Sequence, residues 1–255
     1  MLSVDLNSDL GESYGLYKIG NDKEVLQHIT SASVACGYHA GDHNVMMETV
    51  KMAAAYGVKI GAHPGFPDLH GFGRREMKLD AGEIYNLTVY QIGALAAAAK
   101  VCGTKVAHVK PHGALYNMAV KDKTVAEAIA QAVADVDSSL VLFGLANSWL
   151  VKAGKEKGLI VAQEVFADRT YQADGSLTPR SQANAMIHDP DVAIKRVIRM
   201  VKEAKVEAID GTVIGIKADT ICIHGDEPQA LDFAVKLKTA LSAEGIKVGK
   251  GWDTR

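Results

Sequence analysis

Short apolar runs alternate with longer amphipathic segments along most of the chain. Runs typical of a buried strand occupy residues 2–6, 32–36, 58–62, 105–109, 140–145, 159–165 and 220–223. Helical periodicity predicts helices over residues 43–56, 81–102, 123–134, 190–204 and 228–244, and another that ends near residue 157. Strands that alternate with helices of this length are typical of parallel βαβ units.

The strand pattern favours a closed barrel over an open sheet. Each strand is a continuous apolar run, as expected where both faces of a parallel sheet are covered. Neither G-x-G-x-x-G after the first strand nor G-x-x-x-x-G-K-[ST] anywhere is present, which disfavours an open nucleotide-binding sheet. We therefore predict an α/β fold, a parallel (β/α)7-type barrel, as a single domain over residues 1–255.

Composition narrows the class of protein. The chain carries 28 Lys and Arg against 30 Asp and Glu, so it lacks the basic surplus of a nucleic-acid binder. No stretch approaches the roughly 20 apolar residues of a spanning helix, and the first residues do not resemble a signal peptide. We expect a cytoplasmic protein that binds neither nucleic acid nor membrane. Cys36, Cys102 and Cys222 are widely spaced and are expected to be buried free thiols.

Ionisable residues follow nearly every predicted strand. These clusters lie at residues 5–12, 36–43, 62–65, 109–113, 164–169 and 224–226. The carboxyl ends of the strands in a parallel barrel converge on one mouth, where active sites lie. The sequence therefore predicts an enzyme whose site is built at this mouth.

Residues two apart in an extended strand share a face. This spacing groups Asp5 with Asn7 and Asp9, Lys110 with His112, and Glu164 with Asp168 if the chain does not bend between them. A carboxylate inside a barrel needs a partner. Asp5 and Lys110 could satisfy each other as a structural ion pair, or Lys110 could instead clamp a phosphate or an oxyanion.

A metal site is a weaker possibility. His39 and His43 are four residues apart, and with His63 and Asp9 they could hold a divalent ion. His43 could equally cap the following helix or lie on the surface. We assign no metal ligand from the sequence and leave a protein-bound metal open.

Two polar loops follow predicted strands. Residues 64–75 are rich in glycine and end in Arg74 and Arg75, which could bind a carboxylate or phosphate, or pair with surface acids. Residues 167–171 and 177–180 contribute to a second polar loop, which could bind ligand or act as a mobile lid.

Seven motifs resemble the LamB/YcsF family. They are DLNSDLGE at residues 5–12, ACGYHAGD at 35–42, GAHP at 61–64, GFGRR at 71–75, HVKPHGALYN at 108–117, FADR at 166–169 and HGD at 224–226. The likeness runs from about residue 3 to residue 248, and the motifs are long and ordered. It implies a seven-stranded barrel of the glycoside hydrolase/deacetylase type.

The resemblance also implies an activity, that of the A subunit of an ATP-dependent 5-oxoprolinase. Such an enzyme converts 5-oxo-L-proline, ATP and water to L-glutamate, ADP and phosphate, with Mg²⁺ accompanying ATP and with 5-oxoprolinase subunits B and C as partners. The alternatives are a metal-dependent amidohydrolase or deacetylase, and a lactam-binding subunit without chemistry of its own. Fold analogy alone is a weak basis for function.

The implied reaction assigns roles to the clustered residues. Phosphorylation of the lactam carbonyl needs cations for the phosphoryl oxygens and a general base for water. Lys110 and Arg169 are the candidates for positive charge. The candidate bases are Glu12, Asp168 and His112, while Asp9, His39 and His63 would position water or hold a metal. The candidate substrate contacts are Asn7, Arg74, Glu164, His224 and Asp226.

Overall fold

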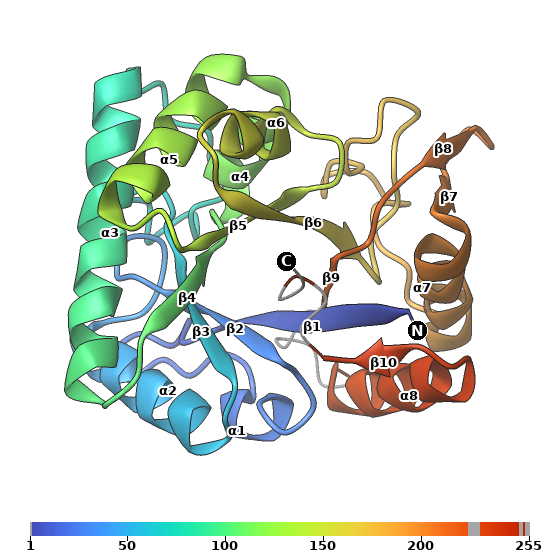
Figure 1. The fold of residues 1–255 in the computed structure, drawn as a ribbon, viewed down its shortest axis with the longest axis horizontal. Coiled ribbons are helices and arrows are strands. Elements are labelled where there is room, and N and C mark those ends of the chain that lie inside the picture. Colours follow the sequence, from blue (N-terminus) through green and yellow to red (C-terminus); the bar gives the residue numbers. More distant parts are fainter. Residues whose placement is uncertain (1, 224–229, 250–251, 253–255) are drawn as a thin grey trace.

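The strands form a closed parallel barrel (Figure 1), in a computed structural model that describes residues 2–223, 230–249 and 252. Its staves are β1 (Ser3–Leu10), β2 (Ser31–Ala35), β3 (Lys59–His63), β4 (Val106–Val109), β5 (Val141–Leu145), β6 (Ile160–Phe166) and β9 (Thr220–Cys222). Each strand pairs with the next, and β9 pairs with both β6 and β1 to close the ring. The predicted barrel of seven strands is confirmed.

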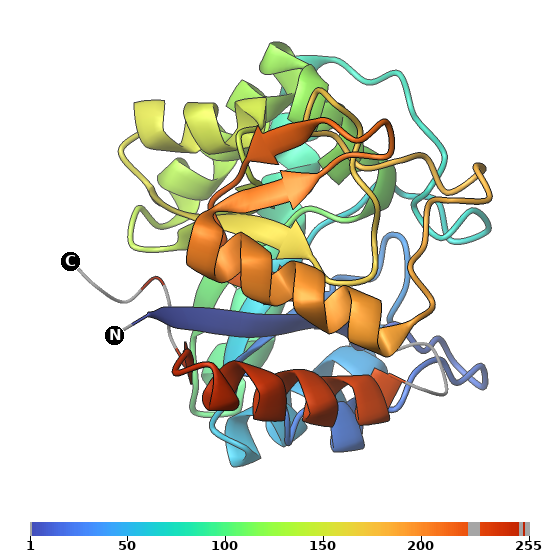
Figure 2. The ribbon, with the colours of Figure 1, turned by 90° about the vertical axis from the view of Figure 1, so that its right-hand side faces the viewer.

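Helices surround the barrel (Figures 1 and 2). They are α2 (His43–Ala55), α3 (Ala81–Val101), α5 (Lys123–Val136), α6 (Trp149–Glu156), α7 (Pro190–Glu203) and α8 (Ala230–Ala243), each close to its predicted position. The Asp80 side chain accepts a hydrogen bond from the Glu83 amide, and the Glu83 side chain accepts one from the Asp80 amide, so a reciprocal cap starts α3.

Some elements lie outside the predicted pattern. They are the helices α1 (Asp22–Val25) and α4 (Gly113–Lys121), the hairpin of β7 (Lys205–Glu207) with β8 (Val213–Gly215), and β10 (Lys247–Val248). Strand β1 also runs four residues beyond the predicted end at residue 6, to Leu10. The polar residues there remain in the strand because they are hydrogen-bonded: the Ser8 hydroxyl, for example, donates to the Ile223 carbonyl at 2.7 Å.

The barrel interior is polar, and the apolar core lies between the strands and the helices. Asp5 is fully buried, and its carboxylate accepts hydrogen bonds from the hydroxyls of Thr30, Ser31 and Thr220. Burial raises the pKa of Asp5 in spite of these bonds. The alternative that Asp5 pairs with Lys110 is wrong, because hydroxyl groups satisfy this carboxylate.

An aromatic layer lies at the amino ends of the strands. His108 stacks on Phe143 with ring centroids 4.2 Å apart, and Trp252 packs edge-on against Phe143. The Lys59 amine lies 3.5 Å from the centre of the Trp252 ring. These contacts fill the barrel below Asp5, which leaves the opposite end for the site.

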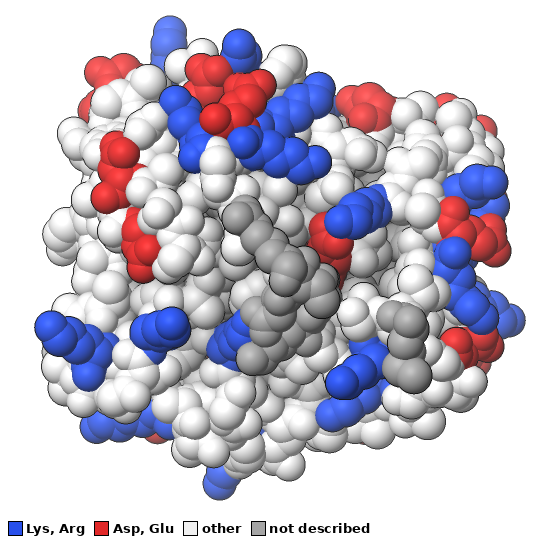
Figure 3. Space-filling model, viewed as in Figure 1, with Lys and Arg blue, Asp and Glu red and all other residues white. Residues whose placement is uncertain are grey.

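The distribution of surface charge and the state of the cysteines can be compared with what the composition predicted. On the face seen in Figure 3, basic and acidic side chains are interspersed. Within the described ranges, no helix has the length and apolar character needed to span a bilayer. All three cysteines are free; Cys36 and Cys222 are buried as predicted, whereas Cys102 is only half-buried.

Gly61 should be indispensable to the packing of the barrel. A β-carbon there would collide with the His108 ring, so Gly61→Ala should destabilise the fold by about 1–3 kcal/mol. Gly93 lies in α3 with open space around it, and Gly93→Ala should stabilise the fold by up to about 1 kcal/mol. Urea denaturation of both variants measures the two effects. Equal stability of the two variants would contradict this account of His108 packing.

Candidate active site

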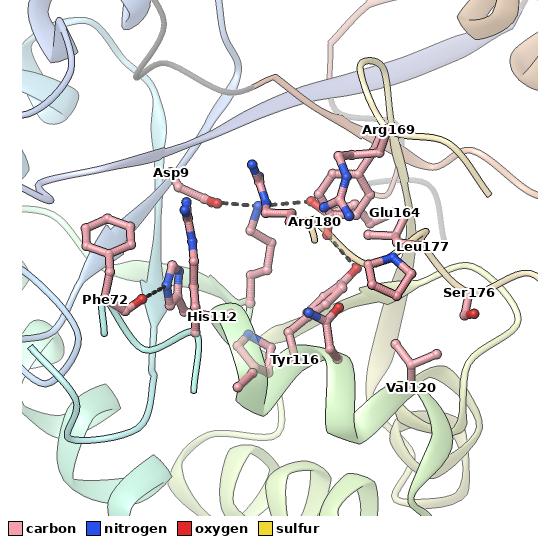
Figure 4. Close-up of a pocket in the computed structure, with 18 of the residues that line it drawn as sticks. Asp9, Phe72, His112, Tyr116, Val120, Glu164, Arg169, Ser176, Leu177 and Arg180 are labelled. Atoms are coloured by element: carbon pink, nitrogen blue, oxygen red, sulfur yellow. Dashed lines mark hydrogen bonds and ion pairs between the residues drawn. The ribbon is translucent and has the colours of Figure 1, made fainter. Parts of the chain in front are cut away.

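A cavity of about 480 Å³ opens at the carboxyl ends of the strands (Figure 4). Its floor includes Asp9, Lys110 and Glu164, one wall includes Glu12, His63 and His112, and its rim includes Arg74, Arg169 and Arg180. The floor and wall side chains come from strands far apart in the sequence. The prediction that polar strand ends converge on one mouth is therefore confirmed for four of the six clusters; His39 of the fifth lies behind the lining, and residues 224–226 lie outside the described residues.

Lys110 lies at the centre of the floor and is only 2% exposed. Its amine lies 2.6 Å from Asp9 Oδ1 and 3.0 Å from Glu164 Oε1, and it donates to Asn7 Oδ1 at 2.8 Å. Dashed lines in Figure 4 mark the two ion pairs. Burial alone would disfavour the ammonium, but Asp9 and Glu164 outweigh it and raise the pKa of Lys110 well above its usual value. Lys110 is therefore charged at neutral pH.

The two carboxylates of the floor are held in place from several sides. Glu164 is fully buried and accepts hydrogen bonds from Asn7 Nδ2 at 3.0 Å and from the Tyr116 hydroxyl at 2.6 Å. Burial and the Glu164 charge raise the pKa of Tyr116, so its hydroxyl keeps the proton that it donates. Burial also disfavours an ionised Asp9, but the nearby His63 and Lys110 hold the pKa of Asp9 well below its usual value. The floor thus combines two carboxylates with one ammonium.

Two imidazoles and one carboxylate form the wall, and a third imidazole, that of His39, lies behind it. His63 Nε2 lies 2.9 Å from His112 Nδ1 and 3.3 Å from Asp9 Oδ2. Glu12 Oε1 lies 3.2 Å from His39 Nε2 and 3.6 Å from His112 Nδ1. Burial lowers the pKa of both His39 and His112 well below the usual value, so both rings are neutral at pH 7.

The glycine-rich loop of residues 64–75 makes this wall possible. A β-carbon at Gly65 would lie 2.7 Å from His39 Nδ1, and one at Gly73 would lie 2.6 Å from the β-carbon of His39. Gly73 also adopts a φ of +63°, which disfavours other residues. The loop can therefore pack closely against His39 because glycine stands at both positions.

The rim is basic. Arg169 is buried and donates to the carbonyls of Thr178 and Ala185. Burial, and next the charge of Arg180, lower the pKa of Arg169 to about 10. Two neighbouring guanidinium groups that repel each other favour an anion between them.

The two adjacent arginines of the glycine-rich loop differ in their surroundings. Arg74 lines the cavity. Arg75 instead forms an ion pair with Asp68, and its side chain is 68% exposed. The interpretation that an arginine of this loop pairs with an acid is thus confirmed for Arg75, whereas anion binding by Arg74 stays a prediction.

The structure brings most of the predicted site residues together, with some exceptions. Asn7 and His39 lie behind the cavity lining and contact residues that form it. Asp168 does not belong to the lining, so its role as a base stays a prediction. His43 is the exposed first residue of α2, and Asp42 caps that helix. His224 and Asp226 lie outside the described residues.

Sequence reasoning did not single out Tyr116 or Phe72. Tyr116 belongs to α4, which has no strong start signal, and its hydroxyl donates to Glu164 at the cavity. The Phe72 carbonyl accepts a hydrogen bond from His112 Nε2 at 2.8 Å. Only the position of both residues within family-like motifs could have indicated them.

Known proteins resemble this chain along nearly its whole length. A relative from Oceanobacillus iheyensis, named as the A subunit of 5-oxoprolinase, is 64% identical over 247 residues, which cover 97% of this chain and 96% of the relative. A relative of the same name from Bacillus subtilis is 58% identical over 248 residues, with 97% of this chain and 96% of the relative covered.

A solved structure shares the fold. The lactam utilization protein from Thermus thermophilus superposes with a TM-score of 0.91 at 46% identity, covering 98% of this chain and 100% of that chain. The model of the LamB/YcsF family matches residues 4–253, which include the floor, the wall and the rim of the cavity. The chain therefore belongs to the LamB/YcsF family.

Proposed function

We propose that this chain is the A subunit of a cytoplasmic, ATP-dependent 5-oxoprolinase that hydrolyses a cyclic amide, 5-oxo-L-proline. The observation that carries the proposal is the name shared by relatives 56–64% identical over nearly the full chain, each of which is named as the A subunit of 5-oxoprolinase. ATP, accompanied by Mg²⁺, is the cosubstrate, and subunits B and C are the partners. The products are L-glutamate, ADP and phosphate.

The charges of the cavity suit this substrate. The carboxylate of 5-oxoproline is an anion, and Arg74, Arg169 and Arg180 at the rim offer guanidinium groups to it or to a phosphoryl group. The floor carries one more carboxylate than ammonium, so it favours a hydrogen-bond donor such as the lactam N–H. A cavity of about 480 Å³ leaves room beside the small lactam for transferred phosphoryl oxygens.

The chemistry needs activated water as well as an activated amide. A lactam resists attack because its amide is resonance-stabilised, and phosphorylation of the carbonyl oxygen makes the carbon electrophilic. The wall of Glu12, His63 and His112 faces the cavity and supplies the groups that orient and deprotonate water. We place this step at the wall and the binding of anionic groups at the rim.

The direct test is glutamate release from 5-oxoproline, measured for the chain alone and for its mixture with subunits B and C. We expect turnover only in the full mixture and only with ATP and Mg²⁺. Glutamate release by the chain alone without ATP would favour a simple amidohydrolase instead. No release from any mixture would overturn the assignment of the substrate.

Replacement of Lys110 should remove activity from the assembled enzyme. Lys110→Met leaves Asp9 and Glu164 without their cation, and kcat should fall by about 100-fold or more. Tyr116→Phe removes only the bond to Glu164 and should lower kcat by about 10-fold while the fold is kept. Lys100→Met, in the last turn of α3, is the matched control. Full turnover of both site variants would refute this role of the floor.

Replacement of an arginine at the rim of the cavity should lower the affinity for substrate. Arg180→Gln removes one guanidinium beside Arg169, so the KM for 5-oxoproline or for ATP should rise by about 10-fold. Arg199, which pairs with Glu203 on the outside of α7, gives the control Arg199→Gln with unchanged kinetics. Steady-state kinetics of the assembled enzyme decide the matter: unchanged KM values for Arg180→Gln would place anion binding elsewhere.

A further inference from the structure

The three side chains of the wall and His39 behind them lie close together, and no role in the proposed reaction explains their arrangement fully. Glu12, His39, His63 and His112 each place one donor atom within 4.8 Å of the donor atoms of the other three. They come from the segment just after β1, the turn after β2, the end of β3 and the residue before α4. Bringing together such donors from four separate segments is typical of a metal site.

Hydrogen bonds fix the tautomers of two of these histidines. His63 Nδ1 lies 2.6 Å from the Lys110 carbonyl, and His112 Nε2 lies 2.8 Å from the Phe72 carbonyl. A carbonyl oxygen only accepts, so these two nitrogens carry the protons. A histidine that binds a metal commonly donates its other N–H to a backbone carbonyl in this way.

As a consequence, the remaining ring nitrogens of His63 and His112 face each other. His63 Nε2 and His112 Nδ1, the two ring nitrogens that do not donate to these carbonyls, lie 2.9 Å apart, and each carries a lone pair wherever its ring holds a single proton. Two acceptors at this distance repel unless a cation bridges them: either a shared proton or a metal ion.

The distances suit a metal. An ion about 2.1 Å from both nitrogens would subtend an angle of roughly 90° between them, close to the cis angle of an octahedral or five-coordinate site. Glu12 Oε1, 3.6 Å from His112 Nδ1, would be the third ligand. All three residues line the cavity, so further positions on the ion would be open to water or substrate.

His39 has a different part in this arrangement. Its ring stacks on that of His112 at 3.6 Å with an interplanar angle of 5°. Lone pairs in two parallel stacked rings cannot converge on one ion. His39 Nε2 lies 3.2 Å from Glu12 Oε1 and is placed to donate its proton there, which makes His39 a positioning residue for the carboxylate.

We infer that Glu12, His63 and His112 bind one divalent transition-metal ion at the wall of the cavity, with His39 orienting Glu12. Two imidazoles and a carboxylate favour ions such as Zn²⁺, Co²⁺, Ni²⁺, Fe²⁺ or Mn²⁺ over Mg²⁺ and Ca²⁺. The ion would lower the pKa of a bound water and so supply the nucleophile for ring opening. Only this use of the ion rests on the proposed function; the binding itself does not.

Titration of the metal-free chain with Co²⁺ tests the inference without lactam, ATP or partner subunits. We expect one Co²⁺ per chain, with visible d–d absorption and competition by Zn²⁺. His63→Gln and His112→Gln should abolish this binding. His39→Asn should weaken it by about 10- to 100-fold and keep the shape of the spectrum. His43→Gln, on the exposed start of α2, is the matched control and should bind as the unaltered chain does.

A measurement on the unaltered chain guards against variants that fail to fold. Proton NMR of the Co²⁺-loaded protein should show two strongly shifted, exchangeable imidazole N–H signals, from His63 and His112. Absence of saturable Co²⁺ binding would overturn the inference in favour of a shared proton. Binding that survives both ligand substitutions would overturn it as well. Because no lactam is present, failure here leaves the proposed function untouched, and failure of the glutamate assay leaves the metal site untouched.

Discussion

The burial of one ammonium group between two carboxylates is the constraint on which the site depends. Lys110 extends from the end of β4 into the barrel, where it meets Asp9 from β1 and Glu164 from β6. Removing one partner from such a buried set typically costs about 3–5 kcal/mol, because an uncompensated charge remains. The interaction can therefore form only when the barrel has closed, since closure brings β1 and β6 within reach of β4. The floor of the site is therefore assembled only when the barrel folds.

A continuous hydrogen-bonded network makes the floor rigid. It runs from Asp5 through Thr220 and Asn7 to Glu164, and each link is 3.0 Å or shorter. Because each of these polar groups has partners, the floor needs no rearrangement when a ligand enters. The basic rim lies opposite, so the cavity presents negative charge at its base and positive charge at its mouth. Under the proposed function, this polarity would orient the lactam with its carboxylate outward and its ring inward.

The sequence predicted the barrel well because parallel strands have a strong apolar signature. It also predicted the position of the cavity, because the polar residues that follow parallel strands lie at the same end of a barrel. It could not predict pairings inside the mouth. The spacing of His39 and His43 indicated a possible metal pair, yet His43 is the exposed first residue of a helix, and the ring that stacks on His39 is that of His112 from a distant segment. The end of β1 was misplaced because Asn7 and Asp9 look like loop residues unless their partners across the barrel are known.

Lys110 also connects the two halves of the site, through different atoms. Its amine pairs with Asp9 and Glu164, whereas its carbonyl accepts a hydrogen bond from His63 Nδ1, which orients His63 Nε2 toward the cavity. Asp9 also contacts both parts of the site: its Oδ1 pairs with the Lys110 amine, and its Oδ2 lies 3.3 Å from His63 Nε2. The charge state of the floor and the orientation of the imidazole wall are consequently coupled through two residues. Because the floor is rigid, these two contacts hold the imidazole wall in place when a ligand enters, although the parts of the site lie on separate strands.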